Sequence, residues 1–382
     1  MKKIFLFGFS ICLPFLLLNC SDKDDLTEEE KMKDSPLTAE QHKQYIENAG
    51  ISFVQALGEF DNTPLPEAID RFSEVVGDLD LKNESIKNFV DFIDGLNNFD
   101  FPEILKLFVF QSSLVNVSDF YYCYTYNDNE YNWTSTPLDG AMKFIFPSTR
   151  EGTINNSTIT LNFSDIGAFF EGNMLPKTIK IVWTIDNKEV LSGEFNVSTF
   201  QHGVPVTQKL QLNIMSSLFY LNYEFTQDDK GLNVYWQLMK SNKQLARIQI
   251  SDNPKYSIVE NQEYVNFVKA GYINVECMNI AIKGVFDLAS ILAEATKYNL
   301  DTPDPQMITN VANLFNKYSS VYAYYSDLKE KIAQMQFYYN QNQQSDGILL
   351  LFTDGSKIDL STYFGSGFTK LFSLIELLDL FD

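Results

Sequence analysis

Histidine is scarce in this 382-residue chain, and so are the motifs that many enzymes build around it. His42 and His202 are the only two histidines, so a zinc site with three histidine ligands is excluded. The sequence contains no Cys-x-x-Cys or His-x-x-x-His spacing, no Gly-x-Ser-x-Gly elbow and no Gly-rich phosphate loop. It also lacks an Asp-x-Asp-x-Asp-Gly run for calcium. No metal or cofactor is therefore predicted.

Basic residues are few relative to acidic ones. The chain has 29 Lys and Arg against 50 Asp and Glu, which gives a formal net charge of −21 at pH 7. Such a charge repels nucleic acids and anionic headgroups, so a nucleic-acid partner is not predicted. Because acidic residues are abundant, many pairs of carboxylates could be proposed as the two acids of a glycosidase. Their presence in the sequence is therefore no evidence for that activity. A glycan-acting hydrolase is the weakest functional alternative, and the chain is predicted not to be an enzyme.

The sequence has no apolar run of the roughly 20 residues that a transmembrane helix needs. Its longest apolar stretch, residues 4–18, follows two lysines, contains Pro14 and stops at Asn19. A short apolar core behind a basic start is typical of a secretory signal peptide. We therefore predict that residues 1–19 are a signal peptide that is removed on export.

The residues Leu17-Leu18-Asn19-Cys20 resemble the lipobox of bacterial lipoproteins. The resemblance implies that the Cys20 thiol is diacylated, with palmitate-type chains, and that its amine is acylated after cleavage. Two or more chains give stable anchoring, because each buried methylene contributes about 0.8 kcal/mol. We predict lipid attachment at Cys20. The alternative is an ordinary secreted protein that is cut near a cysteine.

An acidic stretch, Ser21-Asp22-Lys23-Asp24-Asp25, follows the lipobox. It resembles the export signal of surface lipoproteins of the Bacteroidota, which implies an outer-membrane protein that faces the cell exterior. The alternative is a polar spacer on a periplasmic protein. In both cases residues 20–36 contain too few apolar residues to fold alone, so they are predicted to be a flexible tether. The lipid is the predicted contact with the membrane.

Two cysteines, Cys123 and Cys277, remain beyond the anchor. Both lie in apolar, strand-like surroundings, where a free cysteine commonly behaves as a small buried hydrophobe. A disulfide between them is the alternative, because the predicted compartment is oxidising. The sequence leaves both open.

Residues 37–117 are predicted to be helical. Thr38 followed by Gln41 is a capping-box pattern, and apolar residues then recur every three or four positions as far as Phe60. Two prolines at 64 and 66 separate this helix from a second one over about 69–79. Further helices are predicted around 86–96 and 101–114. Their apolar stripes are expected to face a core.

From Phe120 the apolar residues alternate with polar ones, so residues 118–283 are predicted to form antiparallel β-structure. Turn residues such as Asn127-Asp128-Asn129 and Asp186-Asn187-Lys188 leave connections too short for parallel crossovers. The predicted strands are 120–126, 131–136, 141–146, 158–163, 178–185, 189–197, 206–214, 219–225, 232–239, 244–250 and 272–282. They predict a long antiparallel meander.

Residues 284–382 are predicted to be helical, with one β-hairpin. Helical spacing extends over 286–298, 305–335 and 368–380, and the hairpin is expected over 348–352 and 357–360. Helices before and after a run of strands are typical of α+β proteins. We therefore predict an α+β fold in which residues 37–382 form one compact body.

Aromatic residues are dense in two regions. The first is the predicted hairpin, with Phe120, Tyr121, Tyr122, Tyr124, Tyr126, Tyr131 and Trp133. Because successive strand residues point to opposite faces, aromatic rings are expected on both faces of this hairpin. A hydrophobic core explains the rings on one face, and those on the other face are explained only if helices cover that face as well. The second group is predicted to be helical and contains Tyr318, Tyr322, Tyr324, Tyr325, Tyr338 and Tyr339.

Two functional hypotheses follow. The first is a non-catalytic binding protein whose Tyr121, Tyr126 and Trp133 contact a glycan or another envelope protein, because such side chains combine a flat apolar face with a polar group. The second is a carrier that holds a lipid or other apolar ligand between sheet and helices. The pattern of Leu175-Pro176, 185–190 and Gly203-Val204-Pro205 resembles a group of uncharacterised Bacteroidota lipoproteins, and this resemblance implies no activity.

Overall fold

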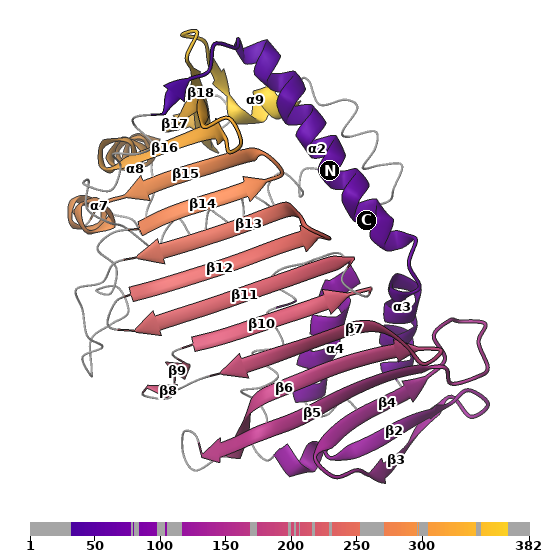
Figure 1. Cartoon of the computed structure of the whole chain (residues 1–382). Coiled ribbons are helices and arrows are strands. Elements are labelled where there is room, and N and C mark those ends of the chain that lie inside the picture. The colour runs from indigo at the N-terminus through magenta and orange to yellow at the C-terminus, as the bar shows by residue number, and fades with distance from the viewer. Residues whose placement is uncertain are drawn as a thin grey trace. The chain divides into compact units, whose positions relative to one another are not determined.

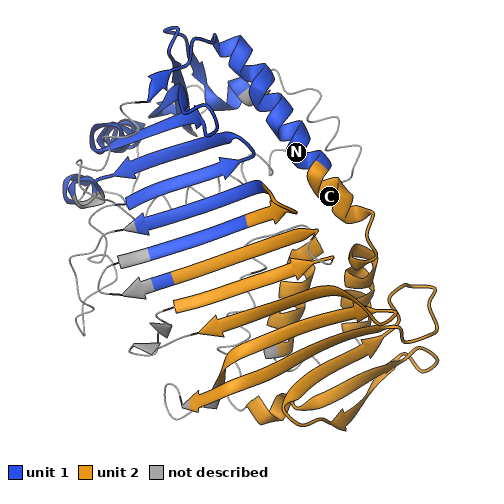
Figure 2. Ribbon diagram, viewed as in Figure 1, with its two compact units in different colours: residues 1–55, 226–237, 244–382 blue, residues 56–225, 238–243 orange. Residues whose placement is uncertain are grey.

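Two compact units make up the chain. The computed structural model describes residues 32–77, 79, 84–97, 104, 117–168, 174–197, 200–201, 204–205, 207–215, 218–228, 231–252, 271–295, 297, 305–340 and 345–365. Its helices and strands are labelled in Figure 1, and Figure 2 colours the two units. Unit 1 contains residues 1–55, 226–237 and 244–382, and unit 2 contains residues 56–225 and 238–243. The prediction that residues 37–382 form one compact body concerns the placement of the two units, and it stays a prediction.

The predicted α+β class is confirmed. Seventeen strands of the described chain belong to a mostly antiparallel sheet, and six α-helices accompany them. Most of the helices precede or follow the long run of strands in sequence, as the change of apolar period predicts (Figure 1).

Unit 2 begins with the end of helix α2 (Ala39–Asp61), followed by α3 (Leu65–Val76) and α4 (Glu84–Asn97). Prolines flank the first residue of α3, where a missing N–H costs no helical hydrogen bond. The apolar stripe of α3 is buried as predicted. The expected helix over 101–114 lies outside the described residues, apart from Ile104.

The strands of unit 2 confirm the predicted strand positions to within a few residues. They are β2 (Tyr122–Asn127), β3 (Asn132–Pro137), β4 (Ala141–Phe146), β5 (Ser157–Ala168), β6 (Met174–Ile185), β7 (Lys188–Val197), β10 (Thr207–Ile214) and most of β11 (Phe219–Asp228). A short 3-10 helix, η2 (Val117–Phe120), precedes them, and β8 (Phe200–Gln201) pairs with β9 (Val204–Pro205). Antiparallel ladders join β4 to β5, β5 to β6, β6 to β7 and β7 to β10.

The β6–β7 connection shows how local chemistry sets the strand ends. Asp186 and Asn187 both have positive φ, at 51° and 61°. Two left-handed residues form the turn that matches the twist of a two-residue hairpin, and Asp and Asn tolerate this conformation better than most residues.

One pairing in unit 2 departs from the predicted antiparallel meander. Strand β2 pairs with β3 in the antiparallel sense, but it also pairs with β4 in parallel, with Tyr124 opposite Phe144. The chain reverses direction after β2 and again at 138–140, so β2 and β4 run the same way. The expectation that short links join consecutive strands in the antiparallel sense holds for β2 and β3, and the parallel pair β2–β4 is not consecutive in sequence.

Unit 1 combines strands with helices from both ends of the chain. Its elements are β1 (Lys33–Asp34), the first part of α2, residues 231–237 of β12 (Gly231–Lys240), residues 244–252 of β13 (Lys243–Asp252), β14 (Gly271–Cys277), β15 (Ile280–Phe286), α7 (Leu288–Ala295), α8 (Pro305–Tyr318), β16 (Ser319–Tyr325), β17 (Glu330–Asn340), β18 (Ser345–Phe352), β19 (Lys357–Asp359) and α9 (Leu360–Gly365). Each of β13 to β18 pairs with the next in the antiparallel sense. Strand β19 completes the predicted hairpin with β18.

Two predictions in unit 1 are wrong. The single strand predicted over 272–282 is the two strands β14 and β15, which reverse at Met278, a residue with φ 55°. The helix predicted over 305–335 ends at Tyr318, and β16 and β17 follow. The run Val321-Tyr-Ala-Tyr-Tyr325 suits a pleated strand, and pairing with β15 outweighs its helical spacing. The helix expected over 368–380 lies outside the described residues.

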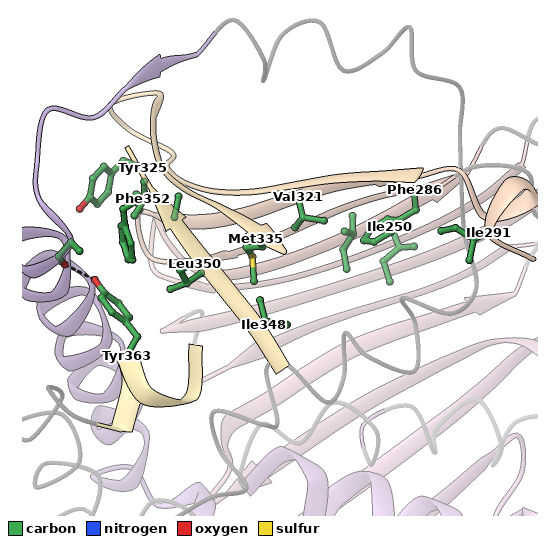
Figure 3. Packing of buried hydrophobic residues seen from close by; sticks show 14 of the residues in the cluster. Ile250, Phe286, Ile291, Val321, Tyr325, Met335, Ile348, Leu350, Phe352 and Tyr363 are labelled. Atoms are coloured by element: carbon green, nitrogen blue, oxygen red, sulfur yellow. Dashed lines mark hydrogen bonds between the residues drawn. The ribbon is translucent and has the colours of Figure 1, made fainter. Parts of the chain in front are cut away.

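One face of the unit 1 sheet is apolar and forms its core. Val321, Met335 and Leu350 lie opposite one another on the neighbouring strands β16, β17 and β18, and Figure 3 shows them with Ile250 of β13, which belongs to the same cluster. Helices α2, α7 and α9 add apolar side chains to the same cluster. We call this side of the sheet the core face, and the alternation of strand residues puts every second side chain on the other side.

The start of unit 1 is fixed to its sheet. Strand β1 pairs in parallel with β17, and the Ser35 N–H donates to the Lys331 carbonyl at 2.9 Å. The predicted capping box is confirmed, because the Thr38 N–H donates to Gln41 Oε1 at 2.9 Å. The carboxylate of Asp354, in the β18–β19 turn, accepts from the first N–H of α2 at 3.1 Å. The prediction of a flexible tether up to residue 36 is therefore wrong for residues 33–35, which are bound to the sheet, and the start of α2 is held as well.

His42 is completely buried in unit 1. Its Nδ1 lies 2.8 Å from the Tyr325 hydroxyl, and its ring stacks on Phe352 with centroids 5.9 Å apart. Burial lowers the pKa of His42, and the nearby Asp354 carboxylate only partly opposes this shift. His42 is therefore a buried core residue of unit 1.

Cys123 and Cys277 are both free and half-buried. The sequence allows either free thiols or a disulfide between them, and in the structure both thiols are free.

Candidate functional site

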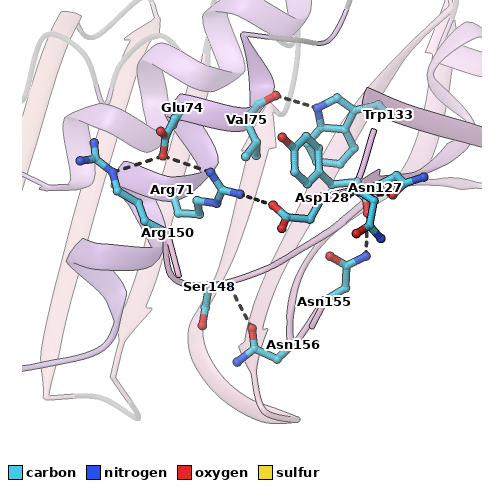
Figure 4. Close-up of polar contacts among 12 residues, drawn as sticks. Arg71, Glu74, Val75, Asn127, Asp128, Trp133, Ser148, Arg150, Asn155 and Asn156 are labelled. Atoms are coloured by element: carbon cyan, nitrogen blue, oxygen red, sulfur yellow. Dashed lines mark hydrogen bonds and ion pairs between the residues drawn. The ribbon is translucent and has the colours of Figure 1, made fainter. Parts of the chain in front are cut away.

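The hairpin aromatics that the sequence nominates lie in unit 2, and two of them pack against each other. The rings of Tyr126 and Trp133 meet edge to face with centroids 5.3 Å apart. The Trp133 indole N–H donates to the Val75 carbonyl of α3 at 2.8 Å (Figure 4). Tyr126 is only 3% exposed. Both rings therefore serve the contact between the hairpin and α3.

A set of ion pairs holds the same contact together. The buried guanidinium of Arg71 donates to Glu74 at 3.1 Å and to Asp128, in the hairpin turn, at 2.9 Å (Figure 4). Arg150 lies against the same Glu74 carboxylate at 3.2 Å. The Arg71 guanidinium also lies 5.5 Å from the centre of the Tyr126 ring. The expectation that Tyr126 offers a face to a ligand is wrong in this structure, because its ring is enclosed.

Tyr121 and Trp133 are half-buried. The Tyr121 ring stacks on Phe163 at 6.1 Å, and burial raises the pKa of its hydroxyl, with a smaller contribution from Asp139. Ligand binding by these two residues stays a prediction. Cys20 lies outside the described residues, so its acylation also stays a prediction.

A second concentration of polar and aromatic side chains lies on unit 1, on the side of the sheet opposite the core face. The strand register places residues directly opposite one another on five neighbouring strands, β13 to β17, which Figure 1 shows side by side. We define the polar face of unit 1 by two such rows. The first row is Gln249, Asn274, Lys283, Tyr322 and Gln334; the second is Arg247, Glu276, Ala281, Tyr324 and Lys331.

A buried carboxylate organises one end of the polar face. Glu276, only 6% exposed, accepts hydrogen bonds from the Arg247 guanidinium, from Gln244 Nε2 at 2.6 Å and from Asn274 Nδ2 at 3.3 Å. Gln244 in turn accepts from Gln237 Nε2 at 3.0 Å. We call these residues the Glu276 network. The carboxylate accepts from donors on the neighbouring strand β13 and on its own strand β14, which explains how a charge is tolerated there.

Tyrosines surround this network. The buried Tyr324 hydroxyl donates to Asn274 Oδ1 at 3.3 Å, and the Lys283 ammonium lies 5.1 Å from the Tyr324 ring centre. Burial raises the pKa of Tyr324 to about 12, although the nearby Lys283 lowers it. Burial likewise raises the pKa of Tyr235 on β12, with Arg247 and Glu276 close enough to influence it. The tyrosine hydroxyls therefore act as neutral hydrogen-bonding groups at pH 7.

Several side chains on the polar face and beside it are only half-buried. Tyr235, Tyr272, Lys283 and Tyr322 all fall in this class, and the Lys331 ammonium lies 5.6 Å from the centre of the Tyr322 ring. A floor of buried polar groups with partly exposed tyrosines and cations around it can bind a ligand that offers both apolar faces and hydroxyl groups.

Sequence reasoning missed this site although a signal was present. Tyr272, Asn274 and Glu276 alternate with apolar residues, which marks a strand with a polar side. Tyr322 and Tyr324 belong to the second aromatic group, but that group was predicted to be helical. A helical assignment separates residues two apart onto different sides, whereas the strand brings them onto one face.

Neither a metal centre nor a membrane helix is found in the described part of the chain. None of its helices is both long and apolar enough to cross a membrane. Over the same residues, no three or more His, Cys, Asp or Glu side chains are grouped so as to hold a metal ion.

Comparisons with known proteins add little. No family model and no curated protein matches the chain. Among solved structures, a porin-like protein from Bacteroides vulgatus is similar over 53% of this chain and 91% of its own, with 10% identity and a TM-score of 0.18. A TM-score of that size supports no statement about fold or function, so the residues themselves carry the functional argument.

Proposed function

We propose that this protein is an outer-membrane lipoprotein that is anchored through Cys20, faces the cell exterior and binds a glycan without catalysis. The polar face of unit 1 is the proposed binding surface. One observation carries the proposal: half-buried tyrosines, amide side chains and cations from five neighbouring strands share one side of a sheet, around the Glu276 network.

Sugars suit this surface because they present patches of C–H groups beside hydroxyl groups. The ring of Tyr322 supplies a flat apolar face with a polar end. The side-chain amides of Gln249 and Gln334, in the same row, can each donate and accept hydrogen bonds. At the strand spacing of about 4.8 Å, five strands span about 19 Å, which is enough for several linked sugars.

The single carboxylate in the two rows of the polar face favours binding over hydrolysis. Glycoside hydrolysis ordinarily needs two carboxyl groups about 5–9.5 Å apart. Glu276 is the one carboxylate in the two rows, and both of its oxygens already accept hydrogen bonds within the Glu276 network. An acid held in this way supports the shape of a surface and is not free to transfer a proton.

The length of the tether supports action close to the membrane. Thirteen peptide units connect Cys20 to Lys33, the first residue of β1. At about 3.5 Å per residue, a fully extended segment of this length reaches at most about 45 Å. Because β1 is paired with β17, this edge of the unit 1 sheet stays within that distance of the lipid.

The anchor is tested by replacing its cysteine. We expect Cys20→Ser to abolish palmitate labelling and to move the protein from the outer-membrane fraction to the soluble fraction, because no acyl chain can then be attached. Protease accessibility on intact cells tests the orientation of the wild-type protein. Membrane retention and labelling of the Cys20→Ser variant would show that the anchor lies elsewhere.

The binding surface is tested with a glycan array and the full-length protein in detergent. We expect Tyr322→Ala to weaken glycan binding by about tenfold or more, because it removes a stacking surface from the middle of the polar face. Tyr121→Ala is the matched control, since it removes a half-buried tyrosine from the hairpin that the sequence nominates.

The two variants separate the two candidate surfaces. Loss of binding in Tyr121→Ala with retention in Tyr322→Ala would move the site to the unit 2 hairpin. A wild-type protein that binds no glycan, but carries a co-purifying lipid in native mass spectrometry, would replace the proposal by the carrier hypothesis.

A further inference from the structure

His42 lies where the start of α2 meets the sheet of unit 1, and it is one of only two histidines in the chain. Its side chain is 0% exposed. The Nδ1 atom lies 2.8 Å from the Tyr325 hydroxyl on β16, and the ring stacks on Phe352 of β18. Within the described residues, the Nε2 atom has no hydrogen-bond partner. A charged imidazole carries two N–H donors, so protonation puts a second donor and a positive charge into a buried site.

The ionisable groups of this region come from every element packed against the ring. They are Glu40, Lys43 and Tyr45 on α2, Tyr325 on β16, Glu330 and Lys331 on β17, Asp354 in the β18–β19 turn and Tyr363 on α9. Burial is the largest influence on the ring and lowers the pKa of His42, whereas Asp354, Glu330 and the nearby Leu37 backbone only partly oppose it. The neutral ring is therefore the form that fits this site.

The neighbours of His42 keep their own charge states as the pH falls from 7 to 5. Hydrogen bonds from Ser356 and from the Ala39 N–H lower the pKa of Asp354, so this carboxylate stays ionised. Burial raises the pKa of Tyr325 and of Tyr363, so both hydroxyls stay neutral. A change in this pH range therefore acts on the imidazole.

Three hydrogen bonds next to His42 hold the chain just before α2 on unit 1. The Tyr363 hydroxyl donates to the Ala39 carbonyl at 2.9 Å, which is the dashed contact in Figure 3. The Ala39 N–H donates to Asp354 at 3.1 Å, and the Thr353 hydroxyl donates to the Ser35 carbonyl at 3.0 Å. Because α9, the β18–β19 turn and α2 meet at these bonds, a shift of α2 away from a charged His42 strains all three.

We propose that His42 is an acid-sensitive latch, whose protonation loosens residues 33–39 and the start of α2 from the sheet of unit 1. The sign follows from burial. A histidine that binds its proton less readily in the folded state than in the unfolded state removes stability as the pH falls below its ordinary pKa of 6.5. The latch is thus closed at pH 7 and above and opens progressively below about pH 6.5.

Opening the latch lengthens the predicted tether. Nineteen peptide units connect Cys20 to Ala39, the first residue of α2, against thirteen to Lys33. At about 3.5 Å per residue, the greatest reach rises from about 45 Å to about 65 Å. Acid therefore allows unit 1 to move farther from the membrane. This consequence requires the lipid at Cys20, whereas the latch itself depends only on unit 1.

Hydrogen–deuterium exchange of the full-length protein in detergent tests the latch. Peptides that cover residues 33–46 are followed at pH 7.5, 6 and 5 in the wild type and in His42→Gln, because glutamine keeps an acceptor for Tyr325 and does not titrate. Comparison at equal pH cancels the intrinsic pH dependence of exchange. Relative to the variant, local opening of the wild type is expected to increase by about threefold to thirtyfold between pH 7.5 and pH 5. Thirtyfold is about the limit for a ring whose ordinary pKa is 6.5.

The second histidine provides the matched control. His202→Gln removes it, lies outside the described residues and is expected to leave the pH dependence of residues 33–46 unchanged. This variant also leaves a single imidazole, whose titration by NMR is expected to have its midpoint below the ordinary pKa of 6.5. The NMR measurement tests the latch even where His42→Gln fails to fold. Asp61 and Asp94, whose pKa values burial raises, belong to unit 2 and are kept apart by the local readout.

Three results would overturn the proposal. The same pH dependence in the wild type and in His42→Gln would mean that other groups control the segment. A midpoint for His42 at or above 6.5 would reverse the sign of the effect. Faster exchange in both units, without a step confined to residues 33–46, would mean general acid unfolding and no latch.

Discussion

Replacing Phe72 by alanine is expected to lower the free energy of unfolding of unit 2 by about 3–5 kcal/mol, the usual cost of removing a fully buried aromatic ring. Phe72 lies on α3 and is 0% exposed. Its ring centre lies 5.1 Å from that of Phe146 and 5.3 Å from that of Phe144, both on β4, and 6.3 Å from those of Phe89 and Trp183. Four rings therefore lose a partner, and the cavity left behind cannot collapse without moving α3.

Urea unfolding followed by tryptophan fluorescence measures this loss. Ile154→Ala is the control, because Ile154 also belongs to unit 2 but is 77% exposed, and its truncation is expected to change stability by no more than about 0.5 kcal/mol. A cost below about 1 kcal/mol for Phe72→Ala would mean that α3 does not pack on β4 as described.

Replacing Glu276 by alanine is expected to cost unit 1 about 2–4 kcal/mol, because buried donors lose their shared acceptor. Asn274, only 2% exposed, and the Arg247 guanidinium both donate to this carboxylate, as does Gln244. The estimate lies below that for a fully enclosed ion pair, since Arg247 retains some access to water. Glu276→Gln keeps the acceptor oxygen and is expected to cost less.

An exposed ion pair in the same unit provides the control. Asp34 pairs with Lys331 at 3.4 Å and its side chain is 65% exposed, so Asp34→Ala is expected to cost no more than about 1 kcal/mol. Thermal unfolding monitored by circular dichroism compares the variants. Equal effects of Glu276→Ala and Asp34→Ala would mean that the Glu276 network contributes no more than a surface contact.

Local pattern was a good guide wherever neighbours in sequence are also neighbours in space. The hairpins at Asn127–Asn129 and Asp186-Asn187 form as predicted, because alternation and turn residues specify them within a dozen positions. The same holds for the capping box at Thr38, the apolar stripe of α3 and the strands of unit 2.

Local pattern failed where pairing between distant segments decides the conformation. Residues 319–325 have helical spacing in the sequence but form β16, because β15 and β17 offer ladders on both sides. The candidate site depends on this difference. Tyr322 and Tyr324 share a side with Lys283 and Glu276 only when residues 319–325 form a strand. The polar face could therefore not be predicted while this segment was assigned to a helix.

The sequence by itself determined the α+β class, the order of most helices and strands, and the predictions that concern export, since these depend on composition and on short motifs whose physics is local. The tertiary structure decided which aromatic side chains are exposed enough to contact a ligand. It enclosed Tyr126 between Trp133 and Arg71, and it assembled the polar face from five strands. The exposure of a side chain depends on the strands and helices packed around it, and those neighbours lie tens of residues away along the chain.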